Sequence, residues 1–178
     1  ELRVLTARPS QDDEARVAHR LYGIASVRDV FSAGRWRALA VQEIDTAHAA
    51  GRLPIVCGGT GFYLKALMEG LSPMPEIPEA VRGKVRDDAA TLGAPAAHAA
   101  LARVDPETAG QLDPGDSQRV ARALEVYEAT GRPLAEWQAE ARIAPDPTWF
   151  FGIVLLSPTR EVTNAAVDDR FRAMIEAG

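Results

Sequence analysis

The sequence contains little cysteine and no long hydrophobic run. Cys57 is the only cysteine among 178 residues, which excludes an internal disulfide and a zinc cage made of cysteines. No stretch approaches the roughly 18 consecutive apolar residues of a membrane span, and the first residues lack the apolar core of a secretory signal. With a single thiol, these absences favour a reducing cytoplasm.

Histidine and net positive charge are also scarce. His19, His48 and His98 lie far apart with no acid or cysteine at ligand spacing, which argues against a metal site built from them. The 20 Lys and Arg are outnumbered by 25 Asp and Glu, so the formal net charge is −5. Nucleic-acid binding depends on clustered Lys and Arg, so such a partner would need a local basic face.

The first part of the chain alternates helical and strand-like patterns. Capping residues and apolar spacing predict helices over residues 10–22 and 32–51. Residues 53–57 form a short apolar run rich in β-branched side chains, which is typical of a buried parallel strand. The glycine-rich turn at 58–61 then leads into a helix over 62–69. This order of elements indicates an α/β fold.

After residue 70 the pattern changes. Three prolines within residues 71–78 predict an extended linker, and residues 79–144 show helical segments with polar breaks. A second proline-bearing break at 144–147 precedes another predicted strand at 149–156 and a final helix over 157–177. The simplest interpretation is an α/β core interrupted by a helical insertion, in a chain long enough for one domain with such an insertion.

Several motifs occur in the order found in tRNA dimethylallyltransferases, and the chain resembles that family over nearly its whole length. The motifs are Thr6-Ala7-Arg8-Pro9-Ser10, His19-Arg20-Leu21-Tyr22, Phe31-Ser32-Ala33, Pro54-Ile55-Val56-Cys57-Gly58-Gly59-Thr60-Gly61-Phe62-Tyr63, Asp116-Ser117-Gln118-Arg119-Val120-Ala121-Arg122-Ala123-Leu124-Glu125-Val126, and Arg170-Phe171 with Met174. Any one of these motifs is weak evidence, but their shared order is strong.

The resemblance implies a P-loop NTPase-like parallel-sheet core made of residues 1–77 and 147–178. Residues 78–146 would form an all-helical tRNA-binding insertion. Family members begin with a strand and a phosphate-binding loop, followed by an Asp taken as the general base, and they carry a further C-terminal portion. None of these is found in this sequence. The chain by itself is therefore expected to bind substrates without completing the reaction.

The implied reaction is transfer of a dimethylallyl group from dimethylallyl diphosphate to N6 of the adenosine beside the tRNA anticodon. Mg²⁺ would accompany the diphosphate, with its ligands mostly in the absent N-terminal segment, and the family suggests a monomer. Two alternatives remain open, namely an isopentenyltransferase acting on free adenine nucleotide and a non-catalytic RNA-binding module. The long helical stretch between the proline hinges favours tRNA.

Thr60 lies in the glycine-rich turn that leads into a predicted helix. Unpaired backbone N–H groups at a helix N-terminus suit an anion or a polar base edge, and glycines allow a ligand to come close. From the spacing alone, a plain turn in which Thr60 caps the helix is the favoured interpretation. The resemblance assigns Thr60 a catalytic role in the channel where adenine meets the prenyl donor.

Gln118, Arg119 and Arg122 fall in the first turns of a helix predicted to begin after Asp116. Two arginines at a helix N-terminus oppose the helix dipole, so their presence indicates a use for the cations. Ion pairs with Asp116 or Glu125 would also explain them. The resemblance favours contact with tRNA by all three side chains.

Two further arginines carry predicted roles. Arg82 matches an arginine that the family uses for tRNA contact, although an ordinary exposed charge would fit its surroundings as well. Arg170 shares the apolar face of the last predicted helix with Phe171 and Met174. Its stem could simply extend along that face to water. The resemblance instead makes Arg170 a catalytic residue whose guanidinium binds the diphosphate.

Overall fold

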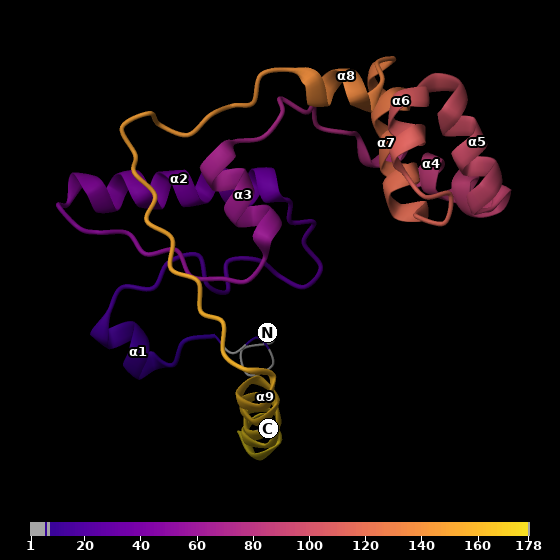
Figure 1. The fold of residues 1–178 in the computed structure, drawn as a ribbon. Coiled ribbons are helices and arrows are strands. Elements are labelled where there is room, and N and C mark those ends of the chain that lie inside the picture. The colour runs from indigo at the N-terminus through magenta and orange to yellow at the C-terminus, as the bar shows by residue number, and fades with distance from the viewer. Residues whose placement is uncertain (1–5, 7, 178) are drawn as a thin grey trace. The chain divides into compact units, whose positions relative to one another are not determined.

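The computed structural model describes residue 6 and residues 8–177 of the chain. Its helices are α1 (Gln11–Arg16), α2 (Ala33–Ala49), α3 (Gly61–Glu69), α4 (Glu79–Leu92), α5 (Ala94–Val104), α6 (Pro106–Gln111), α7 (Ser117–Thr130), α8 (Leu134–Ala139) and α9 (Arg160–Ala177) (Figure 1). The chain divides into two compact units, Glu1–Met68 with Asp146–Gly178, and Glu69–Pro145. No helix of the described residues has the length and apolarity to cross a bilayer.

The predicted parallel-sheet core is wrong. The described residues form no strand, and their one isolated β-bridge pairs Leu71 with Ile143. Both segments expected as strands, 53–57 and 149–156, lie outside regular structure, and Val154 is 86% exposed. An apolar run of β-branched residues indicates that the segment favours an extended backbone. A strand also needs a neighbouring strand to pair with its backbone N–H and C=O groups. Neither segment has such a neighbour among the described residues, so the α/β class and the P-loop NTPase-like core are not found.

Helices with local capping signals form where the sequence predicts them. The Ser32 hydroxyl accepts a hydrogen bond from the backbone N–H of Arg35 at 3.1 Å and starts α2, which buries Ala40 and Ile44. Ser10 and Asp13 form a reciprocal capping box at α1. That helix ends at Arg16, six residues earlier than predicted. Of the first family motif, Ala7 lies outside the described residues, as do residues 1–5 and 178 of the expected core.

In the first unit, α2 and α3 pack around a small apolar cluster. Its buried members are Ala40, Ile44 and Leu67, and the side chains packed against them are Leu21, Trp36, Val41, Trp149 and Phe151. The Nε of Arg37 donates to the backbone carbonyl of Ala66 at 2.9 Å, which joins α2 to α3. Two aromatic side chains of the segment expected as the second strand therefore contribute to this cluster.

In the second unit, α4 to α8 surround a larger core. Its buried members are Ile77, Ala97, Leu101, Ala109, Val120, Ala123, Val126 and Leu134. The helices α4, α5 and α7 pack against one another in pairs. The helical segments expected over this stretch are present, and its assignment as a tRNA-binding insertion with boundaries at 78 and 146 stays a prediction.

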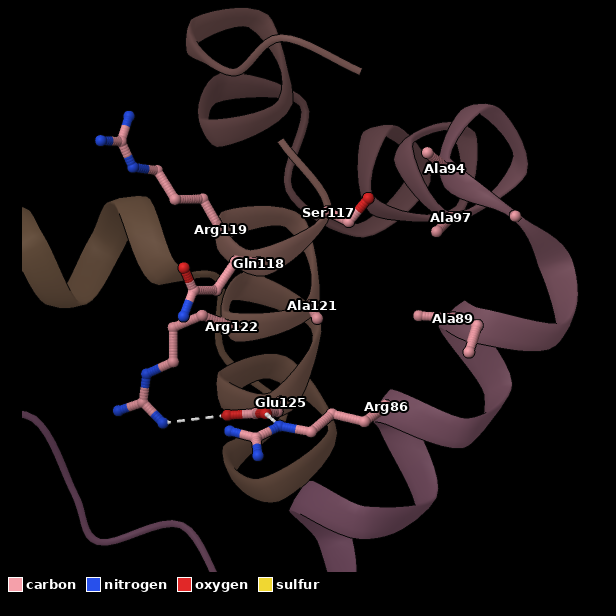
Figure 2. Close-up of a pocket in the computed structure, with 12 residues that line it drawn as sticks. Arg86, Ala89, Ala94, Ala97, Ser117, Gln118, Arg119, Ala121, Arg122 and Glu125 are labelled. Carbon is pink, nitrogen blue, oxygen red and sulfur yellow. Dashed lines mark hydrogen bonds and ion pairs between the residues drawn. The ribbon is translucent and has the colours of Figure 1, made fainter. Parts of the chain in front are cut away.

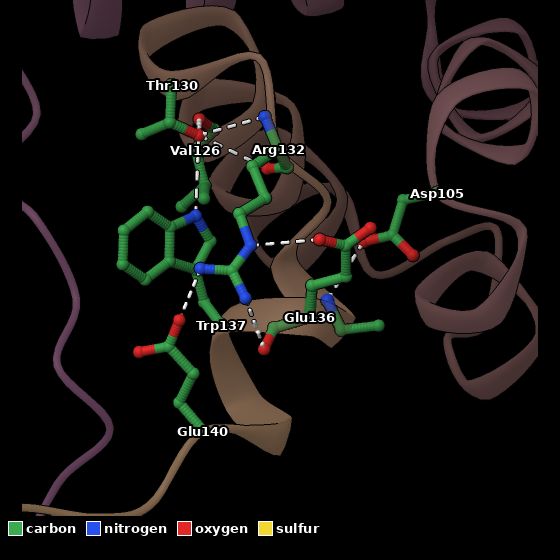
Figure 3. Close-up of polar contacts among 8 residues, drawn as sticks. Asp105, Val126, Thr130, Arg132, Glu136, Trp137 and Glu140 are labelled. Carbon is green, nitrogen blue, oxygen red and sulfur yellow. Dashed lines mark hydrogen bonds and ion pairs between the residues drawn. The ribbon is translucent and has the colours of Figure 1, made fainter.

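Arg132 organises the connection between α7 and α8 (Figure 3). Its Nε donates to Glu136 at 2.9 Å, another nitrogen pairs with Glu140, and the guanidinium carbon lies 4.6 Å from the ring centre of Trp137. The Thr130 hydroxyl accepts from the Trp137 indole N–H at 3.4 Å and from the Arg132 backbone N–H at 3.1 Å. These contacts hold α8 against the end of α7.

Candidate functional site

Helices α4, α5 and α7 enclose a groove of about 790 Å³ within the second unit. Its walls include small side chains of all three helices: Ala89 and Ala90, Ala94 and Ala97, and Ala121. Gln118, Arg119 and Arg122 also line it, and their long side chains project from the side of α7 that faces away from Ala89 and Ala97 (Figure 2). Arg86 of α4 extends toward α7 in the same view. The structure therefore brings three predicted tRNA-binding residues together on one surface. We use the name cationic groove for the groove whose polar lining is Arg86, Ser117, Gln118, Arg119, Arg122 and Glu125.

The start of α7 explains how two arginines are accommodated there. The Asp116 side chain accepts from the backbone N–H of Arg119 at 3.3 Å, which caps the helix. The same carboxylate lies 3.4 Å from the Arg119 guanidinium, whose side chain is 74% exposed. Asp116 thus places a negative charge at the positive end of the helix dipole and offsets the arginines. Gln118 is exposed, and its side chain forms no hydrogen bond within the described part of the chain.

Glu125 also lines the groove, and its side chain is only 2% exposed. Its Oε1 accepts from Arg86 Nε at 2.9 Å and its Oε2 accepts from Arg122 Nη1 at 3.2 Å (Figure 2). The sequence offered Glu125 only as one possible ion-pair partner and gave Arg86 no role. A signal existed in the four-residue spacing of Arg82 and Arg86, which puts both on one face of a helix.

Arg82 is the least exposed of the predicted tRNA contacts. Its side chain is 19% exposed, and its two terminal nitrogens donate to Glu79 at 3.2 Å and to the Ile77 carbonyl at 3.4 Å. Its Nε is buried without a hydrogen bond and lies 4.0 Å from a Glu125 oxygen. Arg82 therefore belongs to the same charge cluster as Arg86 and Arg122, but it does not line the groove.

Thr60 lies in the first unit, immediately before α3. Its carbonyl accepts from the backbone N–H groups of Tyr63 at 3.0 Å and Leu64 at 3.3 Å, so Thr60 starts the helix through its backbone. Thr60 is exposed, and its side chain forms no capping hydrogen bond within the residues that the structure describes. The hydroxyl is therefore open to a ligand.

Arg170 lies on α9, also in the first unit. The face that it shares with Val167 and Phe171 is exposed, so the burial expected for this apolar stripe does not occur in the described residues. Arg172, two residues later, pairs with Asp169 at 3.0 Å. Within residues 8–177, neither an ion pair of Arg170 nor a hydrogen bond between Arg170 and Thr60 is observed.

The described residues do not supply a metal site of their own. Across residue 6 and residues 8–177, no three His, Cys, Asp or Glu side chains are grouped so that they could hold an ion. His98 lies 3.0 Å from the Ala109 carbonyl, and His48 stacks edge-on against Trp149. Both imidazole rings thus contribute to packing within their own units.

Known proteins resemble this chain along its whole length. Residues 1–178 match the model of the IPP transferase family. The tRNA dimethylallyltransferase of Rhodospirillum centenum is 54% identical over 177 residues, covering 99% of this chain and 56% of that protein. That of Parvibaculum lavamentivorans is 49% identical over 180 residues, covering 100% of this chain and 56% of that protein. The chain thus spans about half the length of the curated relatives it matches.

Solved structures show the same likeness. A eukaryotic dimethylallyltransferase acting on tRNA superposes with a TM-score of 0.78 at 23% identity, covering 100% of this chain and 44% of that one, which shows a shared fold. The full-length tRNA isopentenylpyrophosphate transferase of Bacillus halodurans superposes with a TM-score of 0.52 at 28% identity, covering 99% and 54%. The resemblance found in the sequence is confirmed: this chain belongs to the IPP transferase family.

Proposed function

We propose that the full-length protein transfers a dimethylallyl group from dimethylallyl diphosphate to N6 of the adenosine beside the tRNA anticodon. The observation that carries this proposal is the cationic groove, found in a chain of the IPP transferase family. The groove concentrates arginines on one surface of a chain whose formal net charge is −5. A local basic face of this kind is what binding to RNA phosphates requires.

In this proposal the second unit binds the RNA. Arg119 and Arg122 contact phosphates and Gln118 contacts a base edge or a phosphate, since the three project from one side of α7. Arg82 adds positive charge next to Glu125, 4.0 Å from its carboxylate. Phosphate contacts fix the register of the RNA, and the adenine must leave its stack to reach the donor. Unstacking costs about a few kcal/mol, and less in a loop than in a duplex.

The first unit would handle the reacting groups. The Thr60 hydroxyl orients the acceptor adenine, and the Arg170 guanidinium binds two diphosphate oxygens through parallel N–H donors. A bond forms between N6 and the first carbon of the dimethylallyl group, and the bond from that carbon to the diphosphate oxygen breaks. N6 loses a proton to the general-base Asp that the family carries and that the full-length protein would supply. Negative charge grows on the departing diphosphate, and Arg170 stabilises it there. Mg²⁺ would be bound to the diphosphate oxygens, as it is to many substrate phosphates.

The test is nucleoside mass spectrometry of tRNA incubated with the full-length protein, dimethylallyl diphosphate and Mg²⁺. The expected product is an adenosine heavier by one dimethylallyl group. Prenylation of free adenine nucleotide with unmodified tRNA would instead identify a nucleotide-specific isopentenyltransferase. If neither substrate is modified but tRNA binds, the protein is an RNA-binding module.

A further inference from the structure

A buried carboxylate connects two exposed arginines of the cationic groove. Arg86 comes from α4 and Arg122 from α7, and each donates to a different oxygen of Glu125, at 2.9 Å and 3.2 Å. Burying a carboxylate is costly unless it is paired and hydrogen-bonded, so Glu125 depends on these cations. In return, the position of the carboxylate fixes where both guanidinium groups lie.

Both arginines keep binding capacity toward solvent. Their side chains are 61% and 42% exposed, and each uses one nitrogen on Glu125, namely Nε of Arg86 and Nη1 of Arg122. A guanidinium carries five N–H donors in a fixed planar fork, so the other donors of each group are available to a phosphate. A guanidinium that is already held in place loses less side-chain entropy on binding than a free one.

A second ion pair between the same two helices lacks these properties. Lys84 Nζ of α4 lies 2.7 Å from an oxygen of Glu128 of α7, and both residues are exposed. Neither lines the cationic groove. Exposed pairs of this kind contribute little to stability, and they show that α4 and α7 can be bridged without burying a charge. Glu125 differs from Glu128 in two respects: its carboxylate also lies 4.0 Å from the buried Nε of Arg82, and both arginines that donate to it line the groove.

We infer that Glu125 is a positioning residue for RNA binding and that Arg86 is a further RNA contact beside Arg122. Glu125 touches no RNA; it holds two guanidinium groups from different helices at one end of the groove so that both reach the phosphate backbone. The inference rests on the proposed tRNA substrate and extends the contact surface from α7 onto α4.

The inference can be tested by measuring how tightly a fluorescently labelled anticodon stem-loop RNA binds to the full-length protein. What decides is whether Glu125→Gln raises or lowers the affinity. Glu125→Gln removes a negative charge, which by charge alone would strengthen binding to a polyanion. We expect binding to weaken instead, by about fivefold or more, because both arginines lose their anchor. The matched control Glu128→Gln makes the same charge change outside the groove and is expected to leave affinity unchanged or slightly higher.

Arg86→Gln and Lys84→Gln form the second matched pair, each removing one cation of α4. Arg86→Gln is expected to weaken binding and to reduce the slope of log affinity against log salt by about 0.7–0.9, the value of one phosphate contact. Lys84→Gln is expected to change that slope much less. This pair tests the inference if Glu125→Gln fails to fold, because Glu125 still accepts from Arg122 at 3.2 Å when Arg86 is replaced. A melting temperature for each variant shows whether Arg86→Gln remains folded.

Kinetics separate positioning from general damage. Glu125→Gln should raise KM for tRNA and leave kcat unchanged, whereas partial unfolding would lower kcat and leave KM unchanged. The inference is overturned if Glu125→Gln behaves like Glu128→Gln and Arg86→Gln behaves like Lys84→Gln. Failure of the proposed function has a different signature, namely an unmutated protein that prenylates no tRNA.

Discussion

Asp105 and Ala135, thirty residues apart, are joined by a hydrogen bond from the Ala135 backbone N–H to Oδ2 of Asp105 at 3.2 Å. The other oxygen, Oδ1, accepts from the Thr108 backbone N–H at 3.0 Å and caps α6. Asp105 is only 1% exposed. One buried carboxylate therefore both starts α6 and attaches α8 to it, which stabilises the helical unit that carries the cationic groove.

We expect Asp105→Ala to lower the free energy of unfolding by about 2–4 kcal/mol, because it removes a cap and leaves a buried N–H unpaired. Asp116→Ala is the matched control, since Asp116 caps α7 at a partly exposed position and its loss should cost about 1 kcal/mol. Urea unfolding followed by circular dichroism measures both. Equal losses would show that the bond to Ala135 contributes nothing.

The Asp105 carboxylate also makes the stability of the fold depend on pH. Burial raises the pKa of Asp105, but hydrogen bonds from Thr108, Ala135 and Leu134 outweigh it and bring the pKa below the ordinary value of 3.8. A carboxylate whose folded-state pKa is lowered stabilises the fold above the unfolded-state value, and this contribution is lost as pH falls through the folded-state pKa. The difference in melting temperature between the unmutated protein and Asp105→Asn should therefore shrink as the pH falls below 3.8.

Gly70 is required for a close backbone approach. It has φ +82°, and an added Cβ would lie 2.2 Å from the carbonyl oxygen of Ile143. Gly51 has φ +65° with open space around it, so it controls for backbone strain alone. Gly51→Ala should cost about 1 kcal/mol in stability, and Gly70→Ala about 1–3 kcal/mol more. Equal melting temperatures for the two variants would contradict the close contact.

Features that depend on neighbouring residues could be predicted from the sequence, and features that depend on distant ones could not. Ser32 caps α2 through a residue three positions away, and the pattern located that helix correctly. Residues 53–57 have the composition of a strand, but composition says nothing about whether a pairing partner exists. The role of Glu125 was missed for the same reason, because its partner Arg86 lies 39 positions away.

Arg119 should affect RNA binding without affecting the fold. Its side chain is 74% exposed and its one ion pair, with Asp116, is on the surface. Arg119→Ala is expected to change the free energy of unfolding by no more than about 0.5 kcal/mol. It should weaken binding of anticodon stem-loop RNA and reduce the salt slope of binding by about 0.7–0.9. Arg103→Ala, on exposed α5 surface outside the groove, is the control that should leave the slope unchanged.

Thr60 can be tested through its hydroxyl alone. Thr60→Ala removes the group proposed to orient the adenine, and stability should be unchanged because the residue is exposed. We expect kcat to fall by about tenfold or more with little change in tRNA affinity, since the proposed contact acts on the reacting base. Thr60→Ser restores the hydroxyl and should recover most of the rate. A rate that stays low in Thr60→Ser would assign the effect to the methyl group instead.

Arg170 and Arg172 offer a matched pair on one exposed helix. Arg172 pairs with Asp169 at 3.0 Å, whereas Arg170 has no such partner within the described residues. Arg170→Ala is expected to raise KM for dimethylallyl diphosphate and to lower kcat, because a guanidinium on the leaving group stabilises both bound donor and developing charge. KM for tRNA should not change. Arg172→Ala should leave all three constants as they are. If steady-state kinetics show equal effects for the two variants, the diphosphate role of Arg170 is excluded and only the general charge of α9 matters.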